Sequence, residues 1–138
     1  MNAIQRVVLL VMVLAATVLA GCGGSGSPTP QTGVRNISGA ELQGMIANNQ
    51  QTVVLDVRSV PEFNDGHIDG SVNMPINPMA DFLTAISGLD RNATIVVVCG
   101  VGARSRQAAD VLVTQGFTNV YNLTGGLAAW DGGLVRDI

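Results

Sequence analysis

One cysteine in this sequence stands where a reactive thiol would be expected. Cys99 follows the apolar run TIVVV and precedes the loop GVGAR, after which a helical pattern begins. Small side chains let such a loop curl so that its backbone N–H groups face inward. The helix start adds free N–H groups and the positive end of its dipole, and Arg104 adds a full charge. Each of these favours the thiolate, which is the reactive form, so we predict that Cys99 is a nucleophile.

A second interpretation of Cys99 stays open at this point. A cysteine at the end of a buried strand can serve as a small hydrophobic side chain with no chemistry at all. That role needs no Gly-x-Gly-x-Arg sequence after the cysteine, which is why we favour the nucleophile.

The elements that would position Cys99 alternate between strands and helices. Apolar, β-branched runs predict strands, and spaced apolar residues with capping signals predict helices. The predicted strands cover residues 52–57, 94–98 and 119–123, and the predicted helices cover residues 39–47, 61–63, 79–89, 104–115 and 126–130. Strands that are apolar on both faces and alternate with helices indicate an α/β fold, a small parallel β-sheet flanked by helices. Ligands bind at the carboxyl ends of strands in such sheets, and Cys99 lies at one of them.

The N-terminal part of the chain has the features of an export signal. Arg6 precedes an uncharged apolar run over residues 7–20, which is short for a membrane-spanning helix but fits a signal peptide. The run ends in Leu19-Ala20-Gly21-Cys22, which resembles the lipobox of bacterial lipoproteins, where the cysteine is lipidated. We predict a leader over 1–21, a Gly/Ser/Pro tether over 22–33 and a globular domain over 34–138, held at the bacterial cell envelope by lipid on Cys22. Gly23 favours the periplasmic face of the outer membrane where the source has two membranes, and an uncleaved signal anchor is the alternative.

Composition limits the classes of ligand. All seven basic residues are arginines and the net charge is −3, so no basic patch for nucleic acid is expected. His67 is the only histidine, and no metal-ligand spacing occurs, so neither a metal site nor another cofactor is expected. Lipidation of Cys22 would also leave Cys99 without a disulfide partner. An unpaired thiol in an oxidising compartment is open to oxidation unless it is buried or used in chemistry.

Four blocks of this sequence together resemble the single-domain rhodaneses of the thiosulfate sulfurtransferase family. The loop CGVGARS over 99–105 matches the family's C-x-x-G-x-R-S/T active-site loop. The other matches are VLDVR over 54–58, EF at 62–63 with GHIDGSVNMP over 66–75, and NLTGGLAAW over 122–130. The blocks occur in order, with the usual spacing, over roughly residues 35–138.

The resemblance implies a sulfurtransferase that works through a persulfide on Cys99. A small-molecule sulfur donor such as thiosulfate would load the cysteine, and cyanide or a thiol would accept the sulfur, while a protein acceptor stays open. The residues implied to cradle substrate and persulfide are Gly100, Val101, Gly102, Ala103, Arg104 and Ser105.

Other polar residues near the predicted site are assigned mainly structural roles. We expect an ion pair between Arg58 and Glu62, with substrate contact by Arg58 as a further possibility. Asp56 ends a strand near the site and could accept hydrogen bonds from loop amides. His67 is structural in the family that the sequence resembles, and Trp130 is expected to pack at the rim.

Two other functions compete with sulfur transfer. Phosphatases and arsenate reductases also place a cysteine in an anion cradle, but their signature has five residues between Cys and Arg, whereas here Arg104 comes after four. A non-catalytic rhodanese-like domain that binds proteins or senses oxidants is the closer alternative, since an activated thiol oxidises readily.

Overall fold

A computed structural model describes residues 33–48 and 50–137 of the chain. The predicted leader, Cys22 and nearly all of the predicted tether lie outside these residues. Within them, no helix is both long enough and apolar enough to cross a membrane.

Five parallel strands form one sheet in the order β1-β5-β4-β2-β3. They are β1 (Arg35–Ile37), β2 (Thr52–Asp56), β3 (Val72–Asn73), β4 (Thr94–Val98) and β5 (Val120–Leu123). The two apolar runs read as buried strands, β2 and β4, are the central pair, which confirms the predicted parallel α/β fold.

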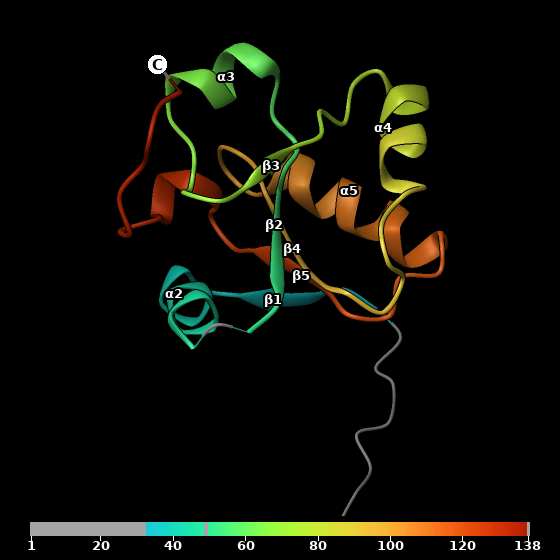
Figure 1. Ribbon diagram of the computed structural model, residues 1–138, viewed down its shortest axis with the longest axis horizontal. Coiled ribbons are helices and arrows are strands. Elements are labelled where there is room, and N and C mark those ends of the chain that lie inside the picture. Colours follow the sequence, from blue (N-terminus) through green and yellow to red (C-terminus); the bar gives the residue numbers. More distant parts are fainter. Residues whose placement is uncertain (1–32, 49, 138) are drawn as a thin grey trace, which may run out of the picture.

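Helices cover both faces of the sheet (Figure 1). They are α2 (Gly39–Ala47), α3 (Val60–Asp65), α4 (Met79–Ile86), α5 (Ala103–Thr114) and the short 3-10 helix η1 (Gly126–Ala129). Helices α4 and α5 pack on the larger apolar cluster, whereas α2 and η1 pack on the opposite face. The predicted capping box at the start of α2 is present: the Ser38 amide donates to Glu41, and the Glu41 amide donates to the Ser38 hydroxyl.

Two details of the predicted elements were wrong. Helix α4 ends at Ile86, three residues before the predicted end. The edge strand β1 was not predicted, because three residues are too few to show a period of two.

Candidate active site

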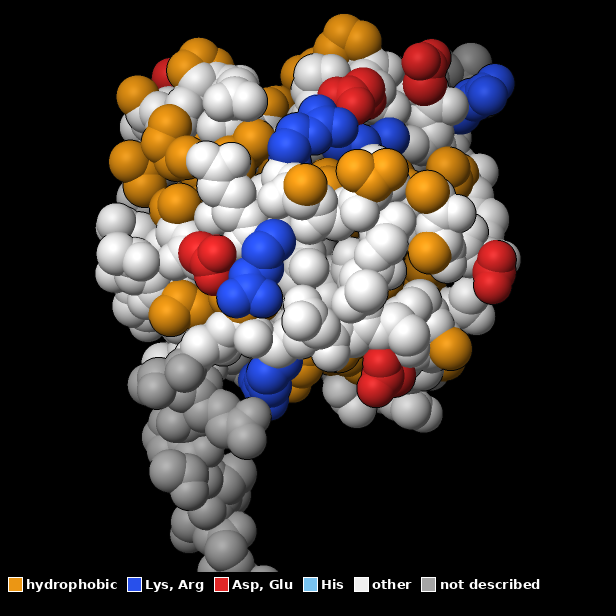
Figure 2. Space-filling view, turned by 180° about the vertical axis from the view of Figure 1, so that it is seen from behind, with side chains coloured by type: hydrophobic (Ala, Val, Ile, Leu, Met, Phe, Trp, Pro, Cys, Tyr) orange, Lys and Arg blue, Asp and Glu red, His pale blue; other side chains and the backbone are white. Residues whose placement is uncertain are grey.

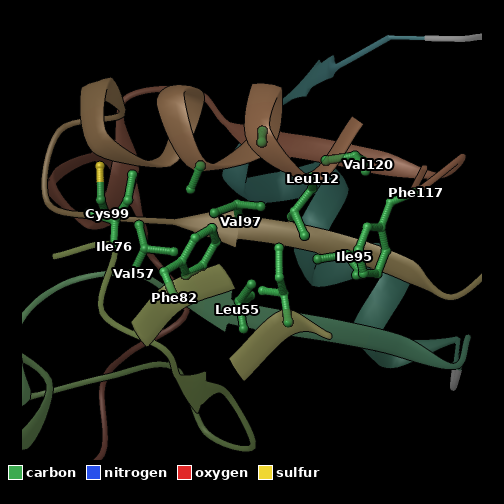
Figure 3. Packing of buried hydrophobic residues seen from close by; sticks show 13 residues of the cluster. Leu55, Val57, Ile76, Phe82, Ile95, Val97, Cys99, Leu112, Phe117 and Val120 are labelled. Atoms are coloured by element: carbon green, nitrogen blue, oxygen red, sulfur yellow. The ribbon is translucent and has the colours of Figure 1, made fainter. Parts of the chain in front are cut away.

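Cys99 lies directly after β4, at the carboxyl end of the central strand. Its side chain is 0% exposed and belongs to the larger apolar cluster. Figure 3 shows it at one end of that cluster, near Ile76 and Val57, with its sulfur directed toward the first turn of α5. Cys99 is therefore both a member of the hydrophobic core and the first residue of the loop that leads into α5.

The loop after Cys99 surrounds the sulfur with hydrogen-bonding groups. The Gly102 amide donates to the Cys99 sulfur at 3.0 Å, and the Ser105 hydroxyl lies 3.3 Å from the same sulfur. Gly102 has φ +100°, a left-handed conformation that a glycine adopts without strain, and α5 begins at the next residue. This turn directs the Gly102 amide toward the sulfur, which is what the predicted inward curl of the loop requires at that residue.

These contacts alter the ionisation of the thiol. Burial alone would raise the pKa of Cys99, but hydrogen bonds from the Ser105 side chain and from the amides of Ser105, Gly102 and Val101 outweigh it. The pKa of the Cys99 thiol is consequently lower than that of a free cysteine. Thiolate is the nucleophilic form, so the loop prepares Cys99 for attack on an electrophile.

The 3-10 helix η1 holds the cysteine loop in place through backbone hydrogen bonds. The amides of Leu127 and Ala128, in η1, donate to the carbonyl oxygens of Cys99 and Gly100 at 2.8 and 3.0 Å. This approach requires Gly126, where a Cβ would come within 2.5 Å of the Cys99 carbonyl oxygen and 2.7 Å of the Gly100 backbone. The Gly-Gly pair before η1 thus serves the active-site loop.

Arg104 is bound to α3 and does not stand free above the loop. Its guanidinium donates to both carboxylate oxygens of Glu62 at 2.8 and 2.9 Å, and both side chains are about two-fifths exposed. Hydrogen bonds from Arg104 and Ser59 hold the pKa of Glu62 well below its usual range, and Glu62 in turn raises the pKa of Arg104. The ion pair therefore stays formed at neutral pH, and its net charge is zero.

The expected ion pair between Arg58 and Glu62 is wrong. Arg58 instead donates to the Asp56 carboxylate, at 2.7 Å for the closest contact, and to the carbonyl oxygen of Gly66 at 2.7 Å. Arg58 precedes the N-terminal cap Ser59, so the four-residue spacing to Glu62 is not a helical spacing. With its guanidinium engaged and its side chain 10% exposed, Arg58 offers little surface to a substrate. Asp56 binds Arg58 and no amide of the cysteine loop.

His67 and Trp130 lie where structural roles place them. The His67 ring is buried, stacks on Phe63 and lies 2.9 Å from the Phe63 carbonyl oxygen through Nδ1. Trp130 packs against the cluster on the α2 face, and its Nε1 donates to the Gly133 carbonyl oxygen. Neither is hydrogen-bonded to the cysteine loop. Within the described part of the chain, no group of three or more His, Cys, Asp and Glu side chains is placed to hold a metal ion.

Charged side chains of α5 and of one face of the molecule are paired or scattered among the described residues. Arg106, which follows the loop on α5, pairs with Asp110 one turn along the exposed face of the helix. Figure 2 shows basic and acidic side chains of one face of the molecule in small separate groups.

One residue of the site was not singled out from the sequence. Asn122 on β5 is 6% exposed, and its side-chain oxygen accepts a hydrogen bond from Ser105 at 2.6 Å. The signal was present, because Val120 and Asn122 alternate onto the same face of a strand and Val120 is a core residue. A polar side chain at a core-facing position indicates a specific hydrogen bond.

The sequence is similar to a known family of domains and to several curated proteins. Residues 38–132 match the model of the rhodanese-like domain. The chain is 43% identical over 77 residues to the thiosulfate sulfurtransferase GlpE of Shewanella oneidensis, an alignment that covers 56% of this chain and 73% of that protein. It is 41% identical over 81 residues to the protein of the same name from Pseudomonas fluorescens, with 59% and 72% covered.

Solved structures show the same fold. The rhodanese-like domain of the Anabaena protein Alr3790 superimposes with a TM-score of 0.66 at 32% identity, covering 75% of this chain and 80% of that chain. A rhodanese-like domain protein from Staphylococcus aureus gives a TM-score of 0.66 at 27% identity, covering 75% and 99%.

Proposed function

The chain belongs to the rhodanese-like domain family and is a sulfurtransferase, and we propose that it takes sulfur from thiosulfate or a related donor through a persulfide on Cys99. The acceptor in this proposal is cyanide or a thiol. Thiosulfate is suggested by the names of the similar GlpE proteins. The carrying observation is the position of the Cys99 sulfur, at the carboxyl end of the central strand and within 3.0 Å of the Gly102 amide.

The first half-reaction loads the cysteine. The Cys99 thiolate attacks the outer sulfur of thiosulfate, a sulfur–sulfur bond forms at Sγ, and the bond between the two donor sulfurs breaks. Sulfite leaves with the electron pair of that bond, and the negative charge now lies on the outer sulfur of the persulfide. Amides of the loop and the first turn of α5 stabilise this charge, because their donors are fixed in place before the reaction.

The second half-reaction returns the enzyme to its thiolate. Cyanide attacks the outer sulfur, thiocyanate forms, and the bond between the two sulfurs of the persulfide breaks with its electron pair returned to Cys99. Two covalent half-reactions of this kind produce ping-pong kinetics. A thiol acceptor would follow the same course as its thiolate.

Mass spectrometry of the full chain in detergent tests the proposal. Incubation with thiosulfate should add one sulfur atom to the protein, and cyanide should remove it. The Cys99→Ser variant should gain nothing, and a gain that persists in this variant would place the sulfur elsewhere. An unchanged mass in the wild type would instead favour the binding or redox-sensing alternative, and hydrolysis of p-nitrophenyl phosphate without sulfur loading would favour phosphatase chemistry.

We further propose that residues 1–21 are a lipoprotein leader and that lipid on Cys22 holds the domain over residues 34–138 at the bacterial cell envelope. The apolar run over residues 7–20 and the lipobox-like sequence after it support this proposal. Two or more acyl chains are what stable anchoring requires. Metabolic labelling with a fatty-acid analogue should label the wild type and not Cys22→Ser, whereas equal labelling of both proteins would contradict the anchor.

A further inference from the structure

Asn122 is a buried amide in an otherwise apolar position. It pairs in register with Val97 of β4, a residue of the larger apolar cluster, and only 6% of its surface is exposed. Burying an amide lowers stability unless its polar atoms are hydrogen-bonded. A valine or leucine would pack at this position without that requirement, so the amide needs an explanation.

Both ends of the Asn122 amide are engaged. Its oxygen accepts from the Ser105 hydroxyl at 2.6 Å, and its nitrogen donates to the side-chain oxygen of Asn36 at 3.3 Å. Asn36 is the register partner of Asn122 on the neighbouring strand β1. The contact with Asn36 therefore directs the oxygen of Asn122, an acceptor, toward Ser105.

The Ser105 hydroxyl has one hydrogen and three neighbours that can accept it. These are the Asn122 side-chain oxygen at 2.6 Å, the Gly102 carbonyl oxygen at 3.1 Å and the Cys99 sulfur at 3.3 Å. While the hydrogen points to Asn122, the Ser105 oxygen can accept a hydrogen bond from the Cys99 thiol. A thiolate has no hydrogen to donate, so the same arrangement leaves Ser105 without a favourable contact to a charged sulfur.

We propose that Asn122 is a positioning residue that accepts the hydrogen bond of the Ser105 hydroxyl while the Cys99 sulfur is uncharged. When the thiolate forms, the Ser105 hydroxyl donates to the sulfur instead. Ionisation removes the thiol proton to solvent, and the Ser105 hydroxyl rotates so that its hydrogen bond to Asn122 breaks and one to Cys99 forms. In the persulfide, a step that rests on the proposed function, the charge has moved to the outer sulfur. The hydrogen then returns to Asn122, so the amide favours the two states in which Sγ is neutral.

Neighbouring charged groups do not enter this exchange directly. At this end of the sheet they form two ion pairs, Arg104 with Glu62 and Arg58 with Asp56. In the described part of the chain, none of the four side chains hydrogen-bonds Asn122 or Ser105. Among the described residues, Ser105 is the one side chain hydrogen-bonded to both Asn122 and the Cys99 sulfur, so a change at Asn122 is expected to reach the sulfur through Ser105.

The test follows the pH dependence of alkylation of Cys99 by iodoacetamide, read on the tryptic peptide 92–104 from the full chain in detergent. Asn122→Leu removes the competing acceptor, so the midpoint should fall by about half a pH unit to one unit, the size of one hydrogen bond. Ser105→Ala should raise the midpoint. Because Asn122 acts through Ser105, the double variant should have the midpoint of Ser105→Ala alone.

Controls separate this role from a structural one. Asn119→Leu removes a second asparagine near β5 that bonds Arg35 and Thr94 at the opposite end of the strands, and it should leave the midpoint unchanged. Asn122→Asp keeps the size of the side chain, adds a charged acceptor and should raise the midpoint. This variant tests the proposal if the leucine variant does not fold. Three outcomes would overturn the proposal. The midpoint could be unchanged or raised in Asn122→Leu, or unchanged in Asn122→Asp. It could also be lower in the double variant than in Ser105→Ala alone. Alkylation needs no sulfur donor, so these outcomes are independent of whether the persulfide forms.

Discussion

Two neighbouring strands of the sheet end in turns of opposite character. Strands β2 and β4 are paired to their last residues, Asp56 opposite Val98, and each leads through a short turn into a helix. The turn after β2 is held by an ion pair, because Arg58 in the turn binds Asp56, the last residue of β2. The turn after β4 consists mostly of small residues, and its Gly102 amide donates to the Cys99 sulfur.

The difference shows that two similar strand-to-helix turns can have different roles, one structural and one catalytic. Charged side chains that satisfy one another make a rigid turn with little capacity left for a ligand, whereas a turn of small residues leaves its backbone donors available. Arg104, in the first turn of α5, is bound to Glu62 on α3, the helix after the β2 turn. The positive character of the cysteine loop therefore comes mainly from backbone amides and the start of α5.

Substituting Gly126 should break the β4 turn most severely. Alanine there would place a Cβ 2.5 Å from the Cys99 carbonyl oxygen, at a residue whose φ is +60°, so the cysteine loop must shift. A displacement of about 1 Å in a catalytic group can lower a rate by ~100-fold, and we expect a loss of that order in sulfur loading of Cys99. The measurement is the rate of persulfide formation by mass spectrometry.

Gly88→Ala is the matched control for the glycine substitution. A Cβ at Gly88 meets no atom within 4 Å, so loading should stay at the wild-type rate. Equal loading by Gly126→Ala and the wild type would mean that the loop does not depend on η1.

Lowering the pH should weaken the same turn without any substitution. The pKa of Cys99 is lowered in the folded protein, so between that value and the pKa of the unfolded chain the unfolded state binds more protons. Stability should accordingly rise with pH across this window and be lost as the pH falls through the folded-state pKa. The alkylation rate should drop about tenfold per pH unit below the same point.

The pH experiment compares the alkylation midpoint of Cys99 in the folded protein with that in urea. A folded-state midpoint at or above the unfolded one would show that burial, which raises the pKa, outweighs the hydrogen bonds. Glu62 also has a lowered pKa, so the ion pair with Arg104 should add no second transition near neutral pH.

The two turns also differ in how far sequence could predict them. The groups that contact the Cys99 sulfur are local to its own segment: an apolar run, small residues and a helix start lie within ten positions. The partners of Arg58 and Arg104 depend instead on how α3 lies against α5, and those helices are about forty residues apart in the chain. Spacing along one segment therefore predicted the wrong partner for Arg58, and Asn122 needed the register of β5 to place it beside Ser105.

Releasing Arg104 from Glu62 should produce a smaller effect, and in the opposite direction. Glu62→Gln leaves the guanidinium charge uncompensated beside the cysteine loop, so a dianion such as thiosulfate should be attracted more strongly. We expect kcat/KM for thiosulfate to rise by about two- to fivefold at low ionic strength and the gain to vanish at high salt, because the pair is exposed and screened.

Asp110→Asn removes the carboxylate of the other exposed ion pair on α5 and serves as the control. It should change kcat/KM for thiosulfate little at any salt concentration. A lower kcat/KM in Glu62→Gln would show that the carboxylate is needed to position Arg104 rather than to neutralise it.

Breaking the β2 turn should change sulfur loading least and stability most. Asp56→Asn leaves the buried Arg58 guanidinium without its carboxylate, and losing one partner of a buried pair costs about 3–5 kcal/mol of unfolding free energy. Each molecule that remains folded should still load Cys99 at close to the wild-type rate, because neither side chain bonds the cysteine loop. Urea unfolding and persulfide formation, measured on the same sample with Asp110→Asn as the exposed control, separate the two quantities. A large loss of rate per folded molecule would show that Asp56 and Arg58 take part in the active site. The contrast between the two turns would then be wrong.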